Sequence, residues 1–193
     1  MDHPRFLALI LAATIVAGTA LPARARPAAP PPAAPGILEQ LFRPLGSPTA
    51  RQLVALKERY APGTIVVSTS QRRLFFVLGG GQAIEYGIGV GRPGFEWTGT
   101  KTVTMKREWP DWRPPVEMLR RRPDLPRYMK GGIGNPLGAR ALYLGSSLYR
   151  IHGSNEPETI GYAVSSGCIR MTNADVQDLY ERVGVGTKVV VLR

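Results

Sequence analysis

Short runs of apolar or alternating residues, separated by clusters of Gly, Pro and small polar residues, repeat along the chain from residue 64 onward. Runs of this length and spacing are typical of β-strands joined by turns. The predicted strands are Thr64–Thr69, Arg73–Leu78, Gln82–Val90, Thr98–Arg107, Ala139–Leu144, Leu148–Ile151 and Thr187–Leu192. The first three are joined by connections too short for a crossover, so we expect an antiparallel meander. The pattern therefore predicts a β-rich fold.

Helical spacing of apolar residues occurs in two places. Residues 37–63 are predicted to form an N-terminal helical segment, because Ser47 followed by a proline is a typical helix start and an apolar stripe follows it. A second helix is predicted after the Gly-Cys pair described below. Thr172 or Asn173 caps it, and Gly184 ends it.

Residues 1–25 are predicted to be a secretory signal peptide. A short basic region with Arg5 precedes an apolar run, and Ala23-Arg24-Ala25 has small residues where a signal peptidase cuts. The run is too short for a comfortable membrane span, although an uncleaved anchor is the alternative. We expect an exported mature chain, in the periplasm or cell envelope, with no transmembrane span. Residues 26–36 are a Pro/Ala-rich linker, extended and semi-rigid.

The chain is strongly basic, with 25 Lys and Arg against 14 Asp and Glu and a formal net charge of +11. Such a surface attracts polyanions. For an exported protein these are cell-wall polymers and anionic lipid head groups, and we do not expect nucleic acid as a partner. The densest cluster is Arg120–Arg122 with Arg127 and Lys130, which a simple solvated face would also explain.

Cys168 is the only cysteine of the chain, and His152 is one of two histidines. The other, His3, lies in the predicted signal peptide. Structural cysteines of exported proteins occur in pairs, so a single one indicates a reactive thiol. A nucleophilic thiol needs a base, and histidine is the usual one. Taken singly, a buried cysteine and a satisfied core histidine are the alternative interpretations.

The sequence around the two residues can bring them together. His152 ends a predicted strand, and a loop rich in glycine, proline and short polar residues leads from it to the Gly-Cys pair. Gly167 permits a sharp bend, at which the amides of Gly167 and Cys168 are expected to form an oxyanion hole. Arg170 offers a fixed charge to a substrate carboxylate or to the thiolate. We also expect the thiol to react well below its ordinary pKa of about 8.5.

The stretch H-G-S-N-E-P-E-T-I-G, followed by S-S-G-C-I-R-M, resembles the active-site signature of the L,D-transpeptidase family, whose catalytic domain is of the YkuD type. Two further stretches are similar to the family, W-P-D-W-R-P-P from Trp109 and G-N-P-L-G-A-R-A-L-Y-L from Gly134. The resemblance covers residues 64–193. It implies a mainly β catalytic domain, an antiparallel sandwich or barrel-like fold with a few short helices.

The resemblance also implies a peptidoglycan L,D-transpeptidase that serves cell-wall biogenesis and cell shape. Cys168 would attack the L-centre of a donor tetrapeptide stem, release D-alanine and form a thioester, which an amine of a second stem takes in a 3-3 crosslink. His152 would act as the base, oriented by the carbonyl of Gly153. Carbapenems would acylate the same cysteine.

Three residues are the candidates for substrate binding: Arg170, Ser166 and Asn155. Many family members have a second histidine at the position of Ser166, a departure that alters the polarity of the pocket and leaves the mechanism standing. For Asn155, a loop-capping amide is the competing interpretation.

Other functions stay open at this point. The same site could pass the acyl group to water, as a peptidoglycan hydrolase or carboxypeptidase, or to an amine of an envelope protein. A non-catalytic wall-binding module, with an incidental cysteine, is an alternative of another class. No metal or other cofactor is expected, because one Cys and one His fall short of a zinc ligand set. The insertion over residues 108–132 is predicted to be a wall or lid over the site, or a loop pinned by two buried tryptophans.

Overall fold

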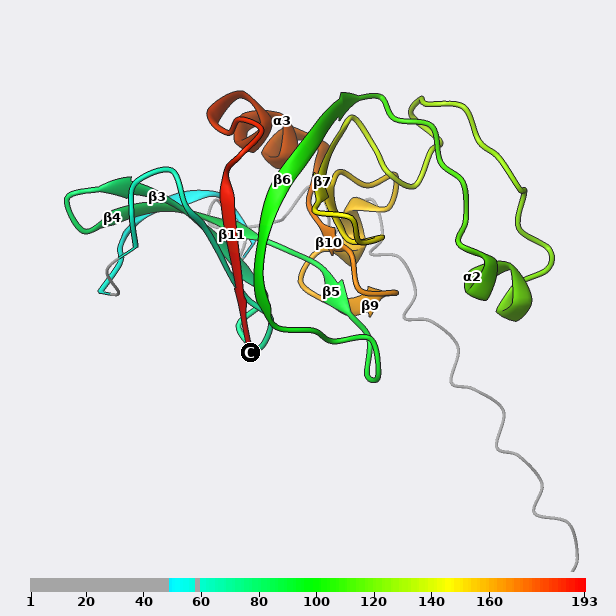
Figure 1. Ribbon diagram of the computed structural model, residues 1–193, viewed down its shortest axis with the longest axis horizontal. Coiled ribbons are helices and arrows are strands. Elements are labelled where there is room, and N and C mark those ends of the chain that lie inside the picture. The colour runs from blue at the N-terminus through cyan, green and yellow to red at the C-terminus, as the bar shows by residue number, and fades with distance from the viewer. Residues whose placement is uncertain (1–48, 58–59) are drawn as a thin grey trace, which may run out of the picture. The chain divides into compact units, whose positions relative to one another are not determined.

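The computed structural model describes residues 49–57 and 60–193 (Figure 1). The predictions for the signal peptide, the linker and the first part of the helical segment lie outside these residues. The strands are β1 (Gln52–Ala55), β2 (Ile65–Ser68), β3 (Arg73–Gly79), β4 (Gln82–Gly87), β5 (Val90–Gly91), β6 (Gly99–Glu108), β7 (Arg140–Leu144), β8 (Arg150–His152), β9 (Ala163–Ser165), β10 (Ile169–Arg170) and β11 (Lys188–Leu192). The helices are α2 (Val116–Arg121), α3 (Asn173–Arg182) and the 3-10 turn η1 (Pro157–Thr159).

Nine of these strands form one mixed sheet in the order β1-β4-β3-β2-β11-β6-β7-β8-β10. The long strand β6 joins the two halves of the sheet, because its first residues pair with β11 and its later residues pair with β7. An irregularity in the β6–β7 register between Val103 and Met105 marks the change of partner. The other two strands, β5 and β9, form a small separate pair that lies next to β10 (Figure 1).

One apolar cluster takes side chains from both halves of the sheet and from α3. Its fully buried members include Leu74 of β3, Tyr86 of β4, Val103 of β6, Leu142 of β7 and Leu179 of α3. Each large apolar side chain buried in this way stabilises the fold by about 1.5–3 kcal/mol. The mainly β architecture with short helices is therefore as predicted, and the predicted meander β2–β3–β4 is antiparallel.

Three strand pairings depart from the antiparallel arrangement that the family resemblance implied. β2 pairs with β11, β8 with β10, and β5 with β9 in parallel. Each pair joins segments that are separated by other elements of the chain, a connection long enough for the crossover that parallel pairing requires. Parallel pairing of β8 and β10 is the arrangement that builds the site described below.

The predicted helix in residues 37–63 is also corrected within the described part. Residues Gln52–Ala55 form β1, which pairs antiparallel with β4 at the edge of the sheet. Leu53, counted as part of an apolar helical stripe, is 61% exposed. Pairing with the open edge of β4 satisfies the backbone of a short segment that a single helical turn would stabilise poorly.

Helix α3 forms as predicted, and both of its ends are held by side chains. The hydroxyl of Thr172, the N-cap, accepts a hydrogen bond of 3.1 Å from the amide of Asp175. At the other end, Lys106 Nζ of β6 lies 2.6 Å from the carbonyl oxygens of Tyr180 and Val183, where a positive charge is favourable. In the described residues no helix is both long and apolar enough to cross a membrane.

Candidate active site

The register of β8 and β10 places the predicted site residues on one face of the sheet. Ile169 lies opposite Ile151, and Arg170 lies opposite His152. Cys168 comes directly before β10, at the level of Arg150. In-register residues of parallel strands share a face, and successive residues alternate between faces. Cys168 and Arg170 therefore face the same side as His152 and Arg150, while the two isoleucines face the core.

His152 is buried, with 5% of its surface exposed, and its Nδ1 lies 2.6 Å from the carbonyl oxygen of Gly153. Because a carbonyl only accepts, this contact assigns the proton to Nδ1 and leaves Nε2 as a proton acceptor. Burial, together with the charges of Arg170 and Arg150, lowers the pKa of His152 to about 3 against the opposing effect of the Gly153 carbonyl. The imidazole is thus neutral at ordinary pH. A neutral imidazole in this tautomer has Nε2 free of a proton and able to accept one.

The backbone around the Gly153 carbonyl, which orients His152, is held by strand β7 and helix α3. The amide of Gly153 donates to the carbonyl of Arg140 on β7, at 3.0 Å. Asn173 Oδ1, in the first turn of α3, accepts hydrogen bonds from the amides of Ala139, at 2.8 Å, and Ser154, at 3.3 Å. A Cβ at position 153 would overlap Asn173 Oδ1. Glycine is therefore required by close packing at this position, and the packing fixes the imidazole.

Cys168 as a residue is half-buried. The thiol donates to the carbonyl oxygen of Leu148, with an Sγ to oxygen distance of 3.7 Å. Burial raises the pKa of the thiol, and Arg150 and Arg170 oppose that rise. The expectation of a thiol with a depressed pKa is therefore wrong for the resting site, because loss of hydration outweighs the neighbouring charges. The resting pair is a neutral thiol and a neutral imidazole.

The predicted oxyanion hole needs a correction at Gly167. The amide of Gly167 donates to the hydroxyl of Ser165, at 3.1 Å, and is not free to bind an oxyanion. The Gly167 carbonyl accepts from Trp97 Nε1 at 2.7 Å, and the Trp97 ring stacks on Tyr149 with centroids 4.5 Å apart. Gly167 has φ of 103°, so the bend itself is as expected. The amide of Cys168 is the remaining donor of the predicted pair.

The three candidates for substrate binding lie in different surroundings. Arg170 is buried, and its Nη2 is held by Ser154 Oγ at 2.7 Å and by Glu156 Oε2 at 2.8 Å. Ser166 accepts a hydrogen bond of 3.1 Å from Arg92 Nη1. The amide of Asn155 donates to the carbonyl of Gly134 at 3.2 Å, which is the loop-capping contact of the competing interpretation. Arg170 thus holds the loop after His152 and acts on the thiol through its charge.

Sequence reasoning missed three residues at the site: Arg92, Trp97 and Arg150. Arg92 and Trp97 come from the segment between β5 and β6, more than 50 residues before the cysteine, and no local pattern connects them with it. Arg150 lies within the predicted strand Leu148–Ile151. Its spacing of two residues from His152 was the available signal, because it places both side chains on one face.

The insertion over residues 108–132 is not pinned by buried tryptophans, as one interpretation proposed. Trp109 is 41% exposed, and Trp112 is half-buried. Asp111 holds the segment instead, accepting from the amide of Gly131 at 2.8 Å and from the hydroxyl of Tyr128 at 3.0 Å. The guanidinium of Arg121, at the end of α2, lies 5.0 Å from the Phe95 ring centroid, so the insertion reaches the segment that carries Arg92 and Trp97. Its role as a lid stays a prediction.

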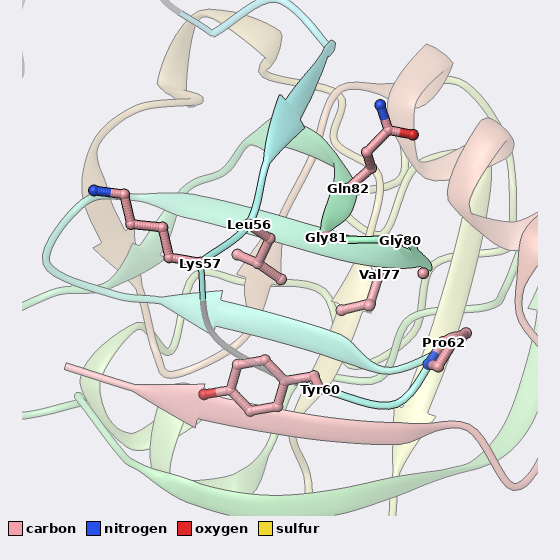
Figure 2. Close-up of a pocket in the computed structure, with 9 residues that line it drawn as sticks. Leu56, Lys57, Tyr60, Pro62, Val77, Gly80, Gly81 and Gln82 are labelled. Atoms are coloured by element: carbon pink, nitrogen blue, oxygen red, sulfur yellow. The ribbon is translucent and has the colours of Figure 1, made fainter.

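A cavity of about 390 Å³ lies elsewhere, beside the turn between β3 and β4 (Figure 2). Its walls include Leu56, Tyr60, Pro62 and Val77 together with the backbone of Gly79–Gln82. None of its lining residues, which also include Lys57, belongs to the site on β8 and β10. Within the residues that the structure describes, no group of three or more His, Cys, Asp or Glu side chains is placed to hold a metal ion.

The chain matches known proteins over the region that contains this site. The family model of the YkuD L,D-transpeptidase catalytic domain matches residues 62–191, more than half of the chain. The probable L,D-transpeptidase ErfK/SrfK of Escherichia coli K12 is 38% identical over 137 residues, which cover 66% of this chain and 43% of that protein. The chain spans about half the length, or less, of the curated relatives that it matches.

Solved structures resemble the chain as well. A Brucella melitensis protein named as a probable carnitine operon oxidoreductase is 47% identical, with a TM-score of 0.50, over 74% of this chain and 93% of that one. The L,D-transpeptidase LdtMt1, solved in complex with imipenem, is 16% identical, with a TM-score of 0.52, over 67% of this chain and 58% of that one. The second likeness concerns the fold alone.

Proposed function

This chain belongs to the L,D-transpeptidase catalytic-domain family, and on that premise we propose that it is a peptidoglycan L,D-transpeptidase with Cys168 as nucleophile and His152 as base. The observation that carries the proposal is the pairing of β8 with β10. It puts the Cys168 thiol on the same face as a neutral imidazole whose Nδ1 is held by the Gly153 carbonyl. A wall-binding module would have no use for an imidazole fixed in the tautomer of a base.

In the acylation step, Nε2 of His152 takes the thiol proton while the sulfur bonds to the carbonyl carbon of the third, L-configured residue of a tetrapeptide stem. The amide of Cys168 would donate to the oxygen that becomes negative. The tetrahedral intermediate then expels D-alanine, and the imidazolium returns its proton to the leaving amine. Because the pKa of His152 is about 3, its imidazolium gives up that proton readily.

In the second step, an amine of another stem attacks the thioester. His152 removes a proton from the attacking nitrogen, the carbon–sulfur bond breaks, and the sulfur recovers its proton from the imidazolium. The product is a 3-3 crosslink, and the enzyme returns to its neutral resting pair. Water in place of the amine would give a carboxypeptidase, and an amine of an envelope protein would give protein attachment. The amine of a second stem is favoured because the curated relatives are L,D-transpeptidases by name.

The experiment is incubation of the purified chain with tetrapeptide-containing muropeptides, followed by mass spectrometry of the products. The proposal expects release of D-alanine and a crosslinked dimer, and loss of both in Cys168→Ala. Formation of free tripeptide without a crosslinked dimer would show that the protein is a carboxypeptidase and not a transpeptidase. Unchanged activity in Cys168→Ala would remove the thiol from the mechanism altogether.

Imipenem supplies a second probe of the same thiol. The fold neighbour LdtMt1 was solved in complex with this carbapenem. We expect imipenem to acylate Cys168, visible as a mass increase that Cys168→Ala lacks.

The proposed substrate also indicates where the protein acts, because peptidoglycan lies outside the cytoplasmic membrane. Export by the predicted signal peptide to the periplasm or cell envelope follows, and secretion of a reporter fused to residues 1–36 tests it.

A further inference from the structure

Arg150 carries an unusual group beside the reactive thiol. Its Nε atom is buried and has no hydrogen-bond partner among the described residues. A buried donor without a partner costs about 1–3 kcal/mol, so such an atom calls for an explanation. Arg150 lies on β8, two residues before His152, and the sheet register places it at the level of Cys168.

The thiol and the guanidinium meet at one carbonyl oxygen. Leu148 O accepts from Cys168 Sγ, at 3.7 Å, and from Arg150 Nη1, at 3.2 Å. A thiol can donate to this oxygen, but a thiolate has no proton to donate and is repelled by it. Deprotonation therefore breaks the thiol's contact with Leu148 and leaves an anion beside a guanidinium that still has an unused Nε donor.

From this arrangement we propose that Arg150 is a positioning residue that stabilises the Cys168 thiolate once the thiol proton has left. In the proposed reaction that proton moves from Sγ to Nε2 of His152, and the electron pair that remains on sulfur faces the Arg150 guanidinium. Only the transfer of the proton to His152 during the reaction rests on the proposed function. The stabilisation of the thiolate itself is a property of the free protein.

The other charged and titratable groups around the sulfur do not replace Arg150. Arg170 on β10 acts on the thiol through its charge, but its Nη2 is bound to Ser154 and Glu156. His152 is neutral in the resting site. Among the neighbouring charges, Arg150 opposes the rise in the thiol pKa more strongly than Arg170, and in the described residues its Nε donor has no partner. The stacking of its guanidinium on Tyr143, 4.9 Å from the ring centroid, holds the group in place.

The test is the pH dependence of alkylation of Cys168 by iodoacetamide, which requires no peptidoglycan substrate. Arg150→Gln should raise the midpoint of the alkylation profile by about one pH unit, so that the rate below the midpoint falls about tenfold. Arg150→Lys keeps the charge and lacks the Nε donor. Its midpoint should lie between those of the wild type and Arg150→Gln.

Arg140→Gln is the matched control. Arg140 lies on the neighbouring strand β7, also has a buried Nε without a partner in the described part, and stacks on Tyr180 at 5.3 Å, but it does not act on the thiol. Its midpoint should equal that of the wild type. A midpoint for Arg150→Gln equal to that of Arg140→Gln would overturn the proposal. If Arg150→Gln does not fold, an unshifted midpoint in Arg150→Lys overturns it.

The two proposals fail in different ways. A normal alkylation shift in a protein that makes no crosslinked dimer would refute the transpeptidase function and leave the role of Arg150 intact. Dimer formation with no shift in either Arg150 variant would do the reverse.

Discussion

The neutral His152 imidazole gives the protein a measurable sensitivity of its stability to acid. In the folded chain burial holds its pKa at about 3, whereas an unfolded chain has the ordinary value of 6.5. As pH falls below 6.5, the unfolded chain takes up a proton at this residue and the folded chain does not. Stability is therefore fully present above the unfolded pKa and is lost as pH falls toward the folded pKa.

The size of the effect follows from these two pKa values. Between pH 7 and pH 5 the unfolded chain gains about 0.7 of a proton at His152, and the free energy of unfolding drops by about 2 kcal/mol. The pKa of Asp178 is lowered to about 2 by its hydrogen bond to Arg182, so its contribution is lost mainly below pH 5.

Urea unfolding at pH 7, 6 and 5, for the wild type and for His152→Gln, measures the effect. The difference in unfolding free energy between the two proteins should change by about 2 kcal/mol from pH 7 to pH 5, with the wild type losing more. Subtracting the variant removes the contribution of His3 and of the carboxylates, which both proteins share. Parallel pH dependence in the two proteins would show that His152 titrates normally, and the assignment of a buried, neutral base would then be wrong.

Three further changes probe the support of the site. In Gly167→Ala the new Cβ would lie 2.6 Å from Tyr149 Cε1 at a φ of 103°. Thermal unfolding should therefore show a loss of stability of about 1–3 kcal/mol, and the rate of muropeptide turnover should fall as well. A variant with the wild-type rate of turnover would contradict the need for glycine at this bend. Trp97→Phe removes the 2.7 Å hydrogen bond to the Gly167 carbonyl. We expect a loss of about 1 kcal/mol in stability and slower alkylation of Cys168. Alkylation at the wild-type rate would show that the bend at Gly167 does not need this contact. Thr172→Ala removes the N-cap hydrogen bond from the amide of Asp175, so stability should fall by about 1 kcal/mol. The pH profile of Cys168 alkylation should stay unchanged. A shifted profile would reveal a coupling between the cap and the site that the structure does not show.

Much of the fold could be predicted because local patterns determine it. The strands β2, β3 and β4 follow apolar runs bounded by turns, β6 follows an alternating pattern, and the cap at Thr172 marks α3. The short segment β1 could not be predicted, since its strand conformation comes from the edge of β4 and not from its own residues. Parallel pairing of β8 with β10 likewise depends on how a long connection returns to the sheet, which no local pattern encodes.

For the site as well, some features could be predicted from the sequence and others could not. A single cysteine, a histidine and the glycine-rich loop between them are the sequence features that predict Cys168 and His152 as the pair, and the contact of Nδ1 with the Gly153 carbonyl is the one that the family resemblance implies. The raised pKa of the thiol could not be predicted, because burial is a property of the packed structure. The engagement of the Gly167 amide by Ser165 depends on the geometry of a tight bend. Trp97 reaches the site only through tertiary packing.

The most direct test of the central claim is the mass of the products formed from tetrapeptide muropeptides by the wild type, Cys168→Ala and His152→Gln. The account predicts a crosslinked dimer and free D-alanine from the wild type, and neither product from either variant. Dimer formed by Cys168→Ala at the wild-type rate would contradict it.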